Sequence, residues 1–206
     1  TILQATQSEE KKASLQRWKD KVGENEAERV RNEAASRGTA MHKFLEYYLR
    51  EEKLLDLTDE GREASSMGQA IIDNSFKEIE EVWGSEVTLF YPGLYAGQTD
   101  LCGIYTGRES IIDFKQTNKP KRREWISDYF VQLGAYAMAH NYIYGTKIQQ
   151  GIILMCSKDG LFQKFEVADK EFVACQHAFL RKVDQYYKEH VNKPNGQNTN
   201  NEQKVQ

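Results

Sequence analysis

Two aspartates and a lysine lie close together near the middle of the 206-residue chain, in the stretch GQTDLCGIYTGRESIIDFKQT at 97–117. Asp100 precedes the Thr106-Gly107 pair, and Asp113 and Lys115 follow it. Such a pair, flanked by β-branched and aromatic residues, predicts a tight hairpin with a two-residue loop. In that hairpin Asp100 lies directly opposite Asp113, with their Cβ atoms about 4.5–5.5 Å apart.

These three groups would share one face of the hairpin, because side chains alternate along a strand. Two carboxylates this close repel each other unless a cation lies between them. Oxygen ligands suit Mg²⁺ or Mn²⁺ better than zinc, so we predict a divalent-metal site in which Lys115 holds or helps to deprotonate a water that attacks phosphorus. The alternative is a surface ion pair between Asp100 and Lys115. The apolar run SIIDFK favours the metal site, since charges at the end of a buried strand require a function.

Two pairs of polar residues occur at helical spacing. His42 and Glu46 are four residues apart on an otherwise apolar helix face. His42 is either a hydrogen-bonded core histidine or a third metal ligand, and Glu46 could then orient it or a metal-bound water. Gln132 and Tyr136 have the same spacing, and the neighbouring Gly134 permits close approach to a sheet or ligand. Alternatively, Gln132 is an ordinary polar helix residue and Tyr136 is an aromatic residue of the core.

A run of cations follows directly after the predicted metal site, in KQTNKPKRREW at 115–125. A charge run of this kind is often a solvated loop. Beside a metal site and Trp125, it also suits a clamp for nucleic-acid phosphates with an aromatic surface for base stacking. The candidate nucleic-acid-binding residues are Gln132, Tyr136, Lys119, Lys121, Arg122 and Arg123.

Apolar periodicity and turn residues divide the chain into helices and strands. The order of elements predicts an α/β fold with a mixed sheet of about five strands flanked by helices. Thr58 and Asp59 can cap a helix that carries Ile79 and Val82 and ends before Gly84, and Asp169 can cap the last helix. The expected elements are helices at 7–22 and 24–52, the capped helix up to 84, three strands within 85–117, a helix at 123–143, a hairpin at 147–167 and a helix at 169–190.

The length suits one domain over residues 1–191, with a mainly helical part at 1–84 and an αβ core at 85–191. The polar residues 192–206 are expected to form a disordered tail. A net charge of −3 gives no overall basic field, so nucleic-acid binding would depend on local cations and bound metal. Three scattered cysteines without a CxxC motif do not support a disulfide framework, a zinc knuckle or an iron-sulfur cluster. No run is apolar enough to predict a membrane span.

Four short motifs together resemble RecB-type nucleases of the PD-(D/E)xK superfamily. They are GTAMHKFLE at 38–46, GQTDL at 97–101, IIDFK at 111–115 and QLGAY at 132–136. The likeness is greatest to the genome-maintenance exonucleases of mitochondria. It implies a PD-(D/E)xK core, and a metal held by both aspartates, His42 and the main-chain carbonyl of Phe114. The resemblance also implies that Lys115 is catalytic and that Gln132 and Tyr136 lie beside the active site and DNA.

The sequence departs from that family pattern at one position near the site, where Gln116 replaces the threonine that commonly follows the motif lysine. No mitochondrial presequence is visible. We therefore expect a phage or bacterial member in the bacterial cytoplasm, or a mitochondrial protein whose presequence was removed.

The resulting hypothesis is a monomeric Mg²⁺- or Mn²⁺-dependent DNA exonuclease that prefers single strands or flaps with a free end. The alternatives are a noncatalytic DNA-binding or recombination accessory module, and a structure-specific endonuclease on the same fold. A glycosidase would also use paired carboxylates, but it would have no evident use for Lys115 or the adjacent cations.

Overall fold

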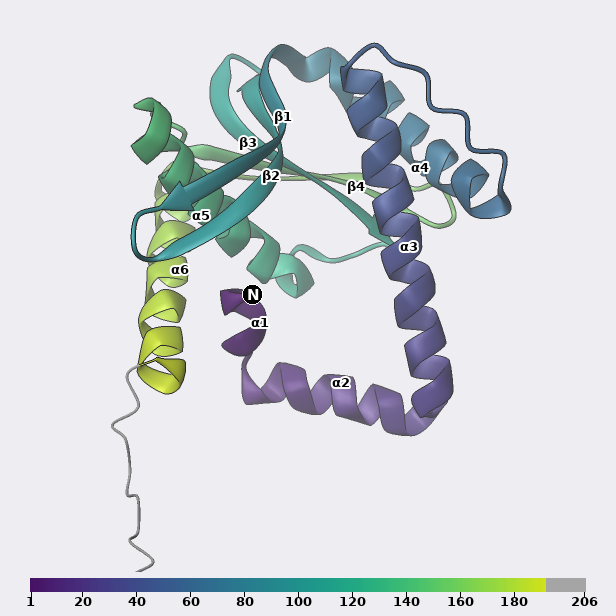
Figure 1. Cartoon of the computed structure of the whole chain (residues 1–206), viewed down its shortest axis with the longest axis horizontal. Helices are drawn as coiled ribbons and strands as arrows, with labels where there is room; N and C mark the ends of the chain where they lie inside the picture. The colour runs from purple at the N-terminus through teal and green to yellow at the C-terminus, as the bar shows by residue number, and fades with distance from the viewer. Residues whose placement is uncertain (192–206) are drawn as a thin grey trace, which may run out of the picture.

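A five-stranded mixed sheet forms the centre of the computed structural model, which describes residues 1–191 (Figure 1). The strands lie side by side in chain order, and only the β3–β4 pair is parallel. The predicted α/β fold with a mixed sheet is therefore confirmed. The strands are β1 (Ile79–Tyr91), β2 (Tyr95–Tyr105), β3 (Arg108–Thr117), β4 (Gln150–Ser157) and β5 (Phe162–Ala168).

Helices cover both faces of this sheet. On one face, α3 (Glu24–Leu49) and α4 (Asp59–Ser75) pack their apolar residues against alternate residues of the central strands, such as Ile112 and Phe114 of β3. On the other face, α5 (Ser127–Tyr144) and α6 (Asp169–His190) cover residues such as Ile111 and Ile153. The alternation of β3 side chains between the two cores follows from the two-residue repeat of a strand.

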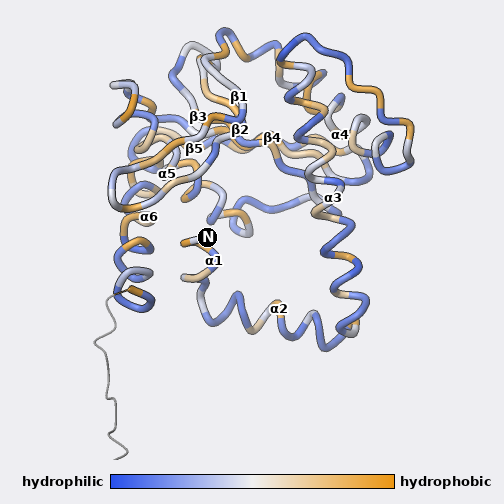
Figure 2. Tube along the Cα trace, viewed as in Figure 1, coloured by the Kyte–Doolittle hydropathy of each residue, from blue (hydrophilic) through white to orange (hydrophobic). Residues whose placement is uncertain are grey.

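Helix α2 (Glu9–Val22) lies outside this three-layer body, whereas the short α1 (Ile2–Ala5) packs Ile2 and Leu3 against α5 and α6. Figure 1 shows α2 apart from the sheet, joined to α3 on one side and to α1 on the other. Neither α1 nor α2 contains a buried residue, and Figure 2 shows α2 as mostly hydrophilic. Lys11 of α2 forms an ion pair with Asp128 of α5, and the Lys182 ammonium of α6 donates to the Thr6 carbonyl at 3.0 Å. Helices α1 to α3 therefore form a frame that is fixed to the body at both ends.

The predicted β2–β3 hairpin has the predicted register. Tyr105 pairs with Arg108, and the ladder continues to Leu101 and Ile112. Thr106 and Gly107 have φ angles of 48° and 75°, both positive, as a type I′ turn requires. The last pair of this ladder is Leu101–Ile112, so Asp100 and Asp113 lie one position beyond the end of the regular pairing.

The predicted end of the helix capped by Thr58 is wrong. Helix α4 ends at Ser75 and is followed by the 3₁₀ helix η1 (Phe76–Glu78), so Ile79 and Val82 lie in β1 rather than in a helix. Their apolar spacing resembles a helical repeat because β1 contains register shifts near both residues, and shifts of this kind break the two-residue alternation of a strand.

Asp169 does not cap α6 with its side chain. Its carboxylate instead accepts a 2.6 Å hydrogen bond from the Arg108 guanidinium. An ion pair with β3 therefore replaces the predicted cap. The predicted helix at 123–143 begins as the 3₁₀ helix η2 (Arg123–Ile126) before α5.

The predicted tail at 192–206 lies outside the described residues. Within residues 1–191, none of the helices combines the length and apolar character needed to cross a membrane.

Candidate active site

Asp113 and Lys115 lie near the end of the central strand β3. The Lys115 ammonium forms an ion pair with Oδ2 of Asp113. Asp113 is only 2% exposed, and its Oδ2 has no hydrogen-bond partner among the described residues. The ion pair therefore brings the two charges together without satisfying the carboxylate by a well-aligned hydrogen bond.

Burial raises the pKa of Asp113 to about 6, although the charge of Lys115 acts in the opposite direction; the nearby Asp100 carboxylate raises it further. Burial also lowers the pKa of Lys115, but the charges of Asp113 and Asp100 outweigh burial and hold it above its usual value. The site therefore favours positive charge beside its carboxylates.

Asp100, on β2, contacts two different elements with its two oxygens. Oδ2 accepts a hydrogen bond from the Phe114 main-chain N–H at 2.7 Å, and Oδ1 lies 3.5 Å from Nδ1 of His42 on α3. Burial raises the pKa of Asp100, yet the contact with His42, the charge of Lys115 and the Phe114 N–H hold it below its usual value. The same contact raises the pKa of His42 against the opposing effect of burial.

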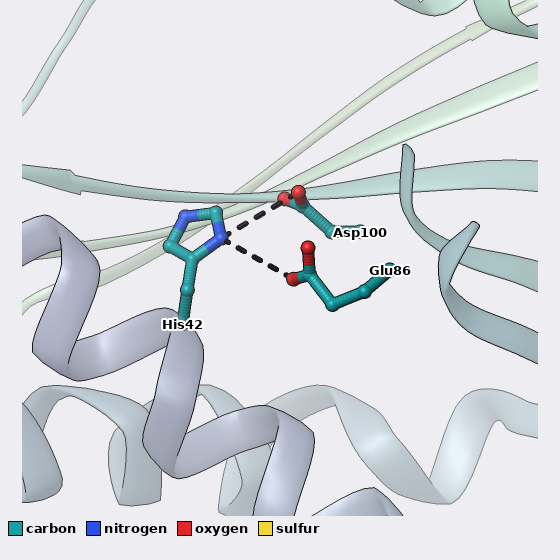
Figure 3. Close-up of side chains that lie close together, drawn as sticks. All are labelled: His42, Glu86 and Asp100. Atoms are coloured by element: carbon teal, nitrogen blue, oxygen red, sulfur yellow. Dashed lines mark ion pairs between the residues drawn. The ribbon is translucent and has the colours of Figure 1, made fainter. Parts of the chain in front are cut away.

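Glu86 of β1 completes a group of three possible ligands (Figure 3). Its Oε1 lies 4.0 Å from Nδ1 of His42, and one ligand atom from each of His42, Glu86 and Asp100 lies within 4.8 Å of the others. Gln98 holds the Glu86 carboxylate through a 2.8 Å hydrogen bond to Oε2. Glu86 has a φ of 53°, in a region that non-glycine residues rarely adopt and that is often found at functional sites. Burial and the Asp100 charge raise its pKa.

An open cavity of about 820 Å³ adjoins this group. Helix α3 forms one wall, and Glu86, Lys115 and Tyr129 contribute from the sheet and α5. The Lys115 ammonium lies 5.2 Å from the centre of the Tyr129 ring. A substrate in this cavity would therefore meet His42, Glu86 and the lysine at the same wall. The α3 residues that line the cavity are Ala34, Ala35, Gly38, Thr39, His42, Lys43, Glu46 and Tyr47.

Comparisons with known proteins agree with the kinship that the four motifs predicted. The chain is 28% identical over 169 residues to mitochondrial genome maintenance exonuclease 1 of Homo sapiens, which covers 77% of this chain and 48% of that protein. It is 28% identical over 202 residues to the Mus musculus protein, which covers 93% of this chain and 59% of that protein. The chain is a homologue of this exonuclease. The motif-based prediction of the relationship is confirmed.

The chain spans about half the length of the curated relatives that it matches. No protein-family model matches the chain. A crystal structure of a candidate exonuclease from Eubacterium rectale has a similar fold, with a TM-score of 0.54 and 13% sequence identity over 74% of this chain and 65% of the other. At this identity the likeness concerns the fold alone.

Gln132 and Tyr136 of α5 line a smaller cavity together with Gly97, not the cavity that adjoins His42 and Lys115. The Gln132 side-chain amide donates to the Tyr136 hydroxyl at 2.7 Å. Burial raises the pKa of Tyr136 to about 12, and the charge of Asp113 contributes to this shift, which reflects their proximity. The Tyr136 ring also packs against Gly97, where an added Cβ would lie 2.7 Å from the ring.

None of the four predicted loop cations lines the cavity. Arg123 is engaged elsewhere, because it bonds to Glu171 at 2.8 Å and to the Glu166 carbonyl at 2.6 Å. Arg122 lies 5.4 Å from the Trp125 ring, and Lys119 is exposed to solvent. Lys121 is held at its backbone by the Gln163 side chain. Glu46 does line the cavity and forms a 2.6 Å ion pair with Arg50.

Sequence reasoning missed Glu86, although a signal for it was present. The Pro92-Gly93 turn sets the register of the β1–β2 hairpin, in which Tyr91 pairs with Tyr95 and Ser85 with Leu101. That register places Glu86 opposite Asp100. Cross-strand pairing counted from this turn, as in the β2–β3 hairpin, indicates the third carboxylate from the sequence.

The donor set fits a hard divalent cation. Carboxylate oxygens with one imidazole nitrogen are ligands that Mn²⁺ accepts, and Mg²⁺ binds through carboxylates and water. Asp113 Oδ2 is ion-paired with Lys115 but has no aligned hydrogen bond within residues 1–191, and burial raises the pKa of both Asp113 and Glu86. A cation at this place would supply positive charge beside these carboxylates.

Proposed function

We propose that the protein is a divalent-metal-dependent DNA exonuclease that hydrolyses phosphodiester bonds in single strands or flaps with a free end. One observation carries this proposal: His42, Glu86 and Asp100 converge beside the Lys115–Asp113 ion pair at the wall of an open cavity. The homology to mitochondrial genome maintenance exonuclease 1 supports nuclease chemistry at this site.

In this proposal, His42, Glu86, Asp100 and Asp113 hold Mg²⁺ or Mn²⁺. Phe114 contributes through its main-chain carbonyl. The N–H and C=O of one strand residue point to the same side, and the Phe114 N–H already points to Asp100. When bound, the cation polarises the phosphodiester and lowers the pKa of a coordinated water.

Lys115 is the proposed catalytic residue that touches the reacting groups. Its ammonium lines the cavity, and Asp113 and the Tyr129 ring restrict its position. From there it can donate a hydrogen bond to the attacking water or to a phosphate oxygen as negative charge develops, which is a form of preorganised electrostatic stabilisation. Asp113 fixes the lysine as well as contributing to the metal site.

The substrate is proposed to be a nucleic-acid strand that enters from an end. The frame formed by α1 to α3 is fixed to the body at both ends, which suits a strand that passes between α2 and the body (Figure 1). Gln132 and Tyr136 would contact the strand beside the metal. Lys119, Lys121 and Arg122 would guide its phosphates outside the cavity, with Trp125 as a stacking surface.

Labelled linear and circular single-stranded DNA of equal length, incubated in Mg²⁺, Mn²⁺ or EDTA, test this function. We expect the parent protein to degrade the linear strand in either metal, to leave the circle intact and to be inactive in EDTA. Lys115→Met should abolish cleavage because it removes the donor, whereas Lys147→Met, at an exposed lysine outside the cavity, should retain the parent rate.

The alternatives give different results in the same assay. Cleavage of the circle would identify an endonuclease on this fold. Binding of DNA without cleavage in both metals would identify a noncatalytic module. Cleavage by Lys115→Met at the parent rate would show that the assigned role of the lysine is wrong.

A further inference from the structure

Arg37 is a buried cation that has no carboxylate partner within residues 1–191. It lies on α3, is 3% exposed, and takes part in none of the arginine ion pairs of residues 1–191. Removing a charged side chain from water is costly, so buried arginines are normally paired with an acidic group. The absence of such a partner within the described residues requires an explanation.

Two neutral amides hold the guanidinium. Arg37 Nε donates to the side-chain oxygen of Gln116 at 2.9 Å, and Nη2 donates to the side-chain oxygen of Asn118. The Gln116 amide nitrogen is directed to the Ala34 carbonyl at 2.7 Å. These contacts fix the orientation of the Arg37 guanidinium but add no negative charge. The third nitrogen, Nη1, has no hydrogen-bond partner among residues 1–191.

This cation lies next to the candidate active site. Gln116 directly follows Lys115 in β3, and it lines the same cavity as Ala34 and Gly38, which are near Arg37 on α3. Helix and strand approach closely here, because a Cβ added to Gly38 would lie 3.6 Å from Gln116 Cγ. Arg37 itself is not among the residues that line the cavity, and neither the proposed metal ligands nor the Lys115–Asp113 pair contacts it.

We propose that Arg37, oriented by Gln116 and Asn118, forms a binding site for a backbone phosphate of the DNA strand, beside the linkage that is cleaved. A phosphate would supply the negative charge that the described residues do not, and a preoriented guanidinium binds phosphate oxygens in a defined geometry. This inference rests on the proposed function, since it assigns a contact to the same substrate. It also gives Gln116, which replaces the threonine of the family motif, a role in orienting Arg37.

The salt dependence of DNA binding tests the proposal. A short dye-labelled oligothymidylate is titrated by fluorescence anisotropy in EDTA at several KCl concentrations, and the logarithm of the association constant is plotted against the logarithm of the salt concentration. Arg37→Met should reduce the magnitude of the slope by about 0.7, the value for one phosphate contact on a single strand. Arg37→Lys, which keeps the charge, should retain most of the slope.

Arg181→Met provides the matched control. It removes the same charge from an exposed position on α6 and should leave the slope unchanged. Should Arg37→Met fail to fold in circular dichroism, Asn118→Asp serves as a second variant. It gives the guanidinium an internal counter-ion at an exposed position, so the slope should fall without loss of the fold.

Folded Arg37→Met or Asn118→Asp with the slope of the parent would overturn the phosphate site and leave Arg37 a link between α3 and β3. That result would not affect the proposed nuclease function. In contrast, if the parent protein shows no salt-dependent binding to the oligonucleotide, the proposed function itself fails.

Discussion

Asp100 connects three elements of the protein through a single carboxylate. Its two oxygens reach the Phe114 main chain on β3 and the His42 ring on α3, and its charge raises the pKa of Glu86 on β1. A change in any of these partners alters the charge balance of the others. At the scale of the residue, the candidate site therefore behaves as one coupled group.

Glu86→Gln tests whether the third carboxylate belongs to this group. The substitution keeps the shape and the contact with Gln98 but removes one anionic ligand. We expect Mn²⁺ binding to weaken by at least about tenfold, a loss typical of damage to a metal site, with cleavage in Mg²⁺ reduced in parallel. Isothermal titration calorimetry measures the first effect and a linear-DNA assay the second.

Glu124→Gln is the control for that experiment, because Glu124 is an exposed carboxylate outside the cavity. It should bind Mn²⁺ like the parent. Unchanged Mn²⁺ affinity in folded Glu86→Gln would remove Glu86 from the proposed ligand set and leave His42, Asp100 and Asp113.

At the scale of the element, the site depends on where the β-ladders end or are distorted. The β2–β3 pairs stop one position before Asp100 and Asp113, and Glu86 takes its positive φ within β1. Each interruption frees side chains or main-chain groups from regular pairing and directs them toward one another. Regular ladders would instead have placed alternate residues of these strands in the two cores.

Helix α5, which carries Gln132 and Tyr136, packs closely against α6 at Gly134. An added Cβ on Gly134 would lie 2.9 Å from the backbone nitrogen of Gln176, and backbone atoms cannot move aside as a flexible side chain can. Gly134→Ala should therefore destabilise the protein by roughly 1–3 kcal/mol, the usual effect of overpacking. Urea unfolding followed by circular dichroism measures the change in the free energy of unfolding.

Gly38→Ala should instead stabilise the protein, so that the free energy of unfolding rises. Its added Cβ would meet Gln116 at an ordinary contact distance of 3.6 Å, and alanine favours a helix over glycine by up to about 1 kcal/mol. Equal stability changes for Gly134→Ala and Gly38→Ala would contradict the assigned close approach of α5 and α6.

At the scale of the whole molecule, the chain has a three-layer body and an external frame. Helix α2 contributes no buried residue, and its Leu15 and Trp18 are exposed by 49% and 37%. Such a helix adds little to the hydrophobic core. Its position is explained more readily by the proposed passage of a DNA strand than by stability.

Removing residues 1–22 tests this division. We expect the melting temperature to change by only a few degrees, because Thr6 is the one fully buried residue in this segment and Ile2 and Leu3 are only partly buried against α5 and α6, and we expect Mn²⁺ binding to remain. Degradation of linear single-stranded DNA should fall strongly, because without α1 and α2 the frame no longer encloses the strand. Differential scanning fluorimetry and the linear-DNA assay give the two readouts, and parent-like degradation by the shortened protein would exclude a role for the frame.

The sequence alone determined the features that depend on local pattern. The Thr106-Gly107 turn set the β2–β3 register, Thr58 capped α4 as expected, and alternating residues of β3 faced the two cores. Turn geometry, capping and side-chain periodicity each involve residues only a few positions apart. The same local rules gave a wrong answer at Asp169, which is the first residue of α6 rather than its N-cap and whose carboxylate pairs with the distant Arg108.

Only the tertiary structure decided which charged groups meet. His42, Glu86 and Asp100 come from a helix and two strands, and Arg37 reaches Gln116 across 79 positions of the chain. Packing α3 against the sheet brings these groups together. The resulting burial acts on the pKa values of His42, Glu86 and Asp100, and it encloses Arg37 with no carboxylate partner among the described residues. Charge and desolvation act through space, so their balance depends on the packed arrangement of distant segments.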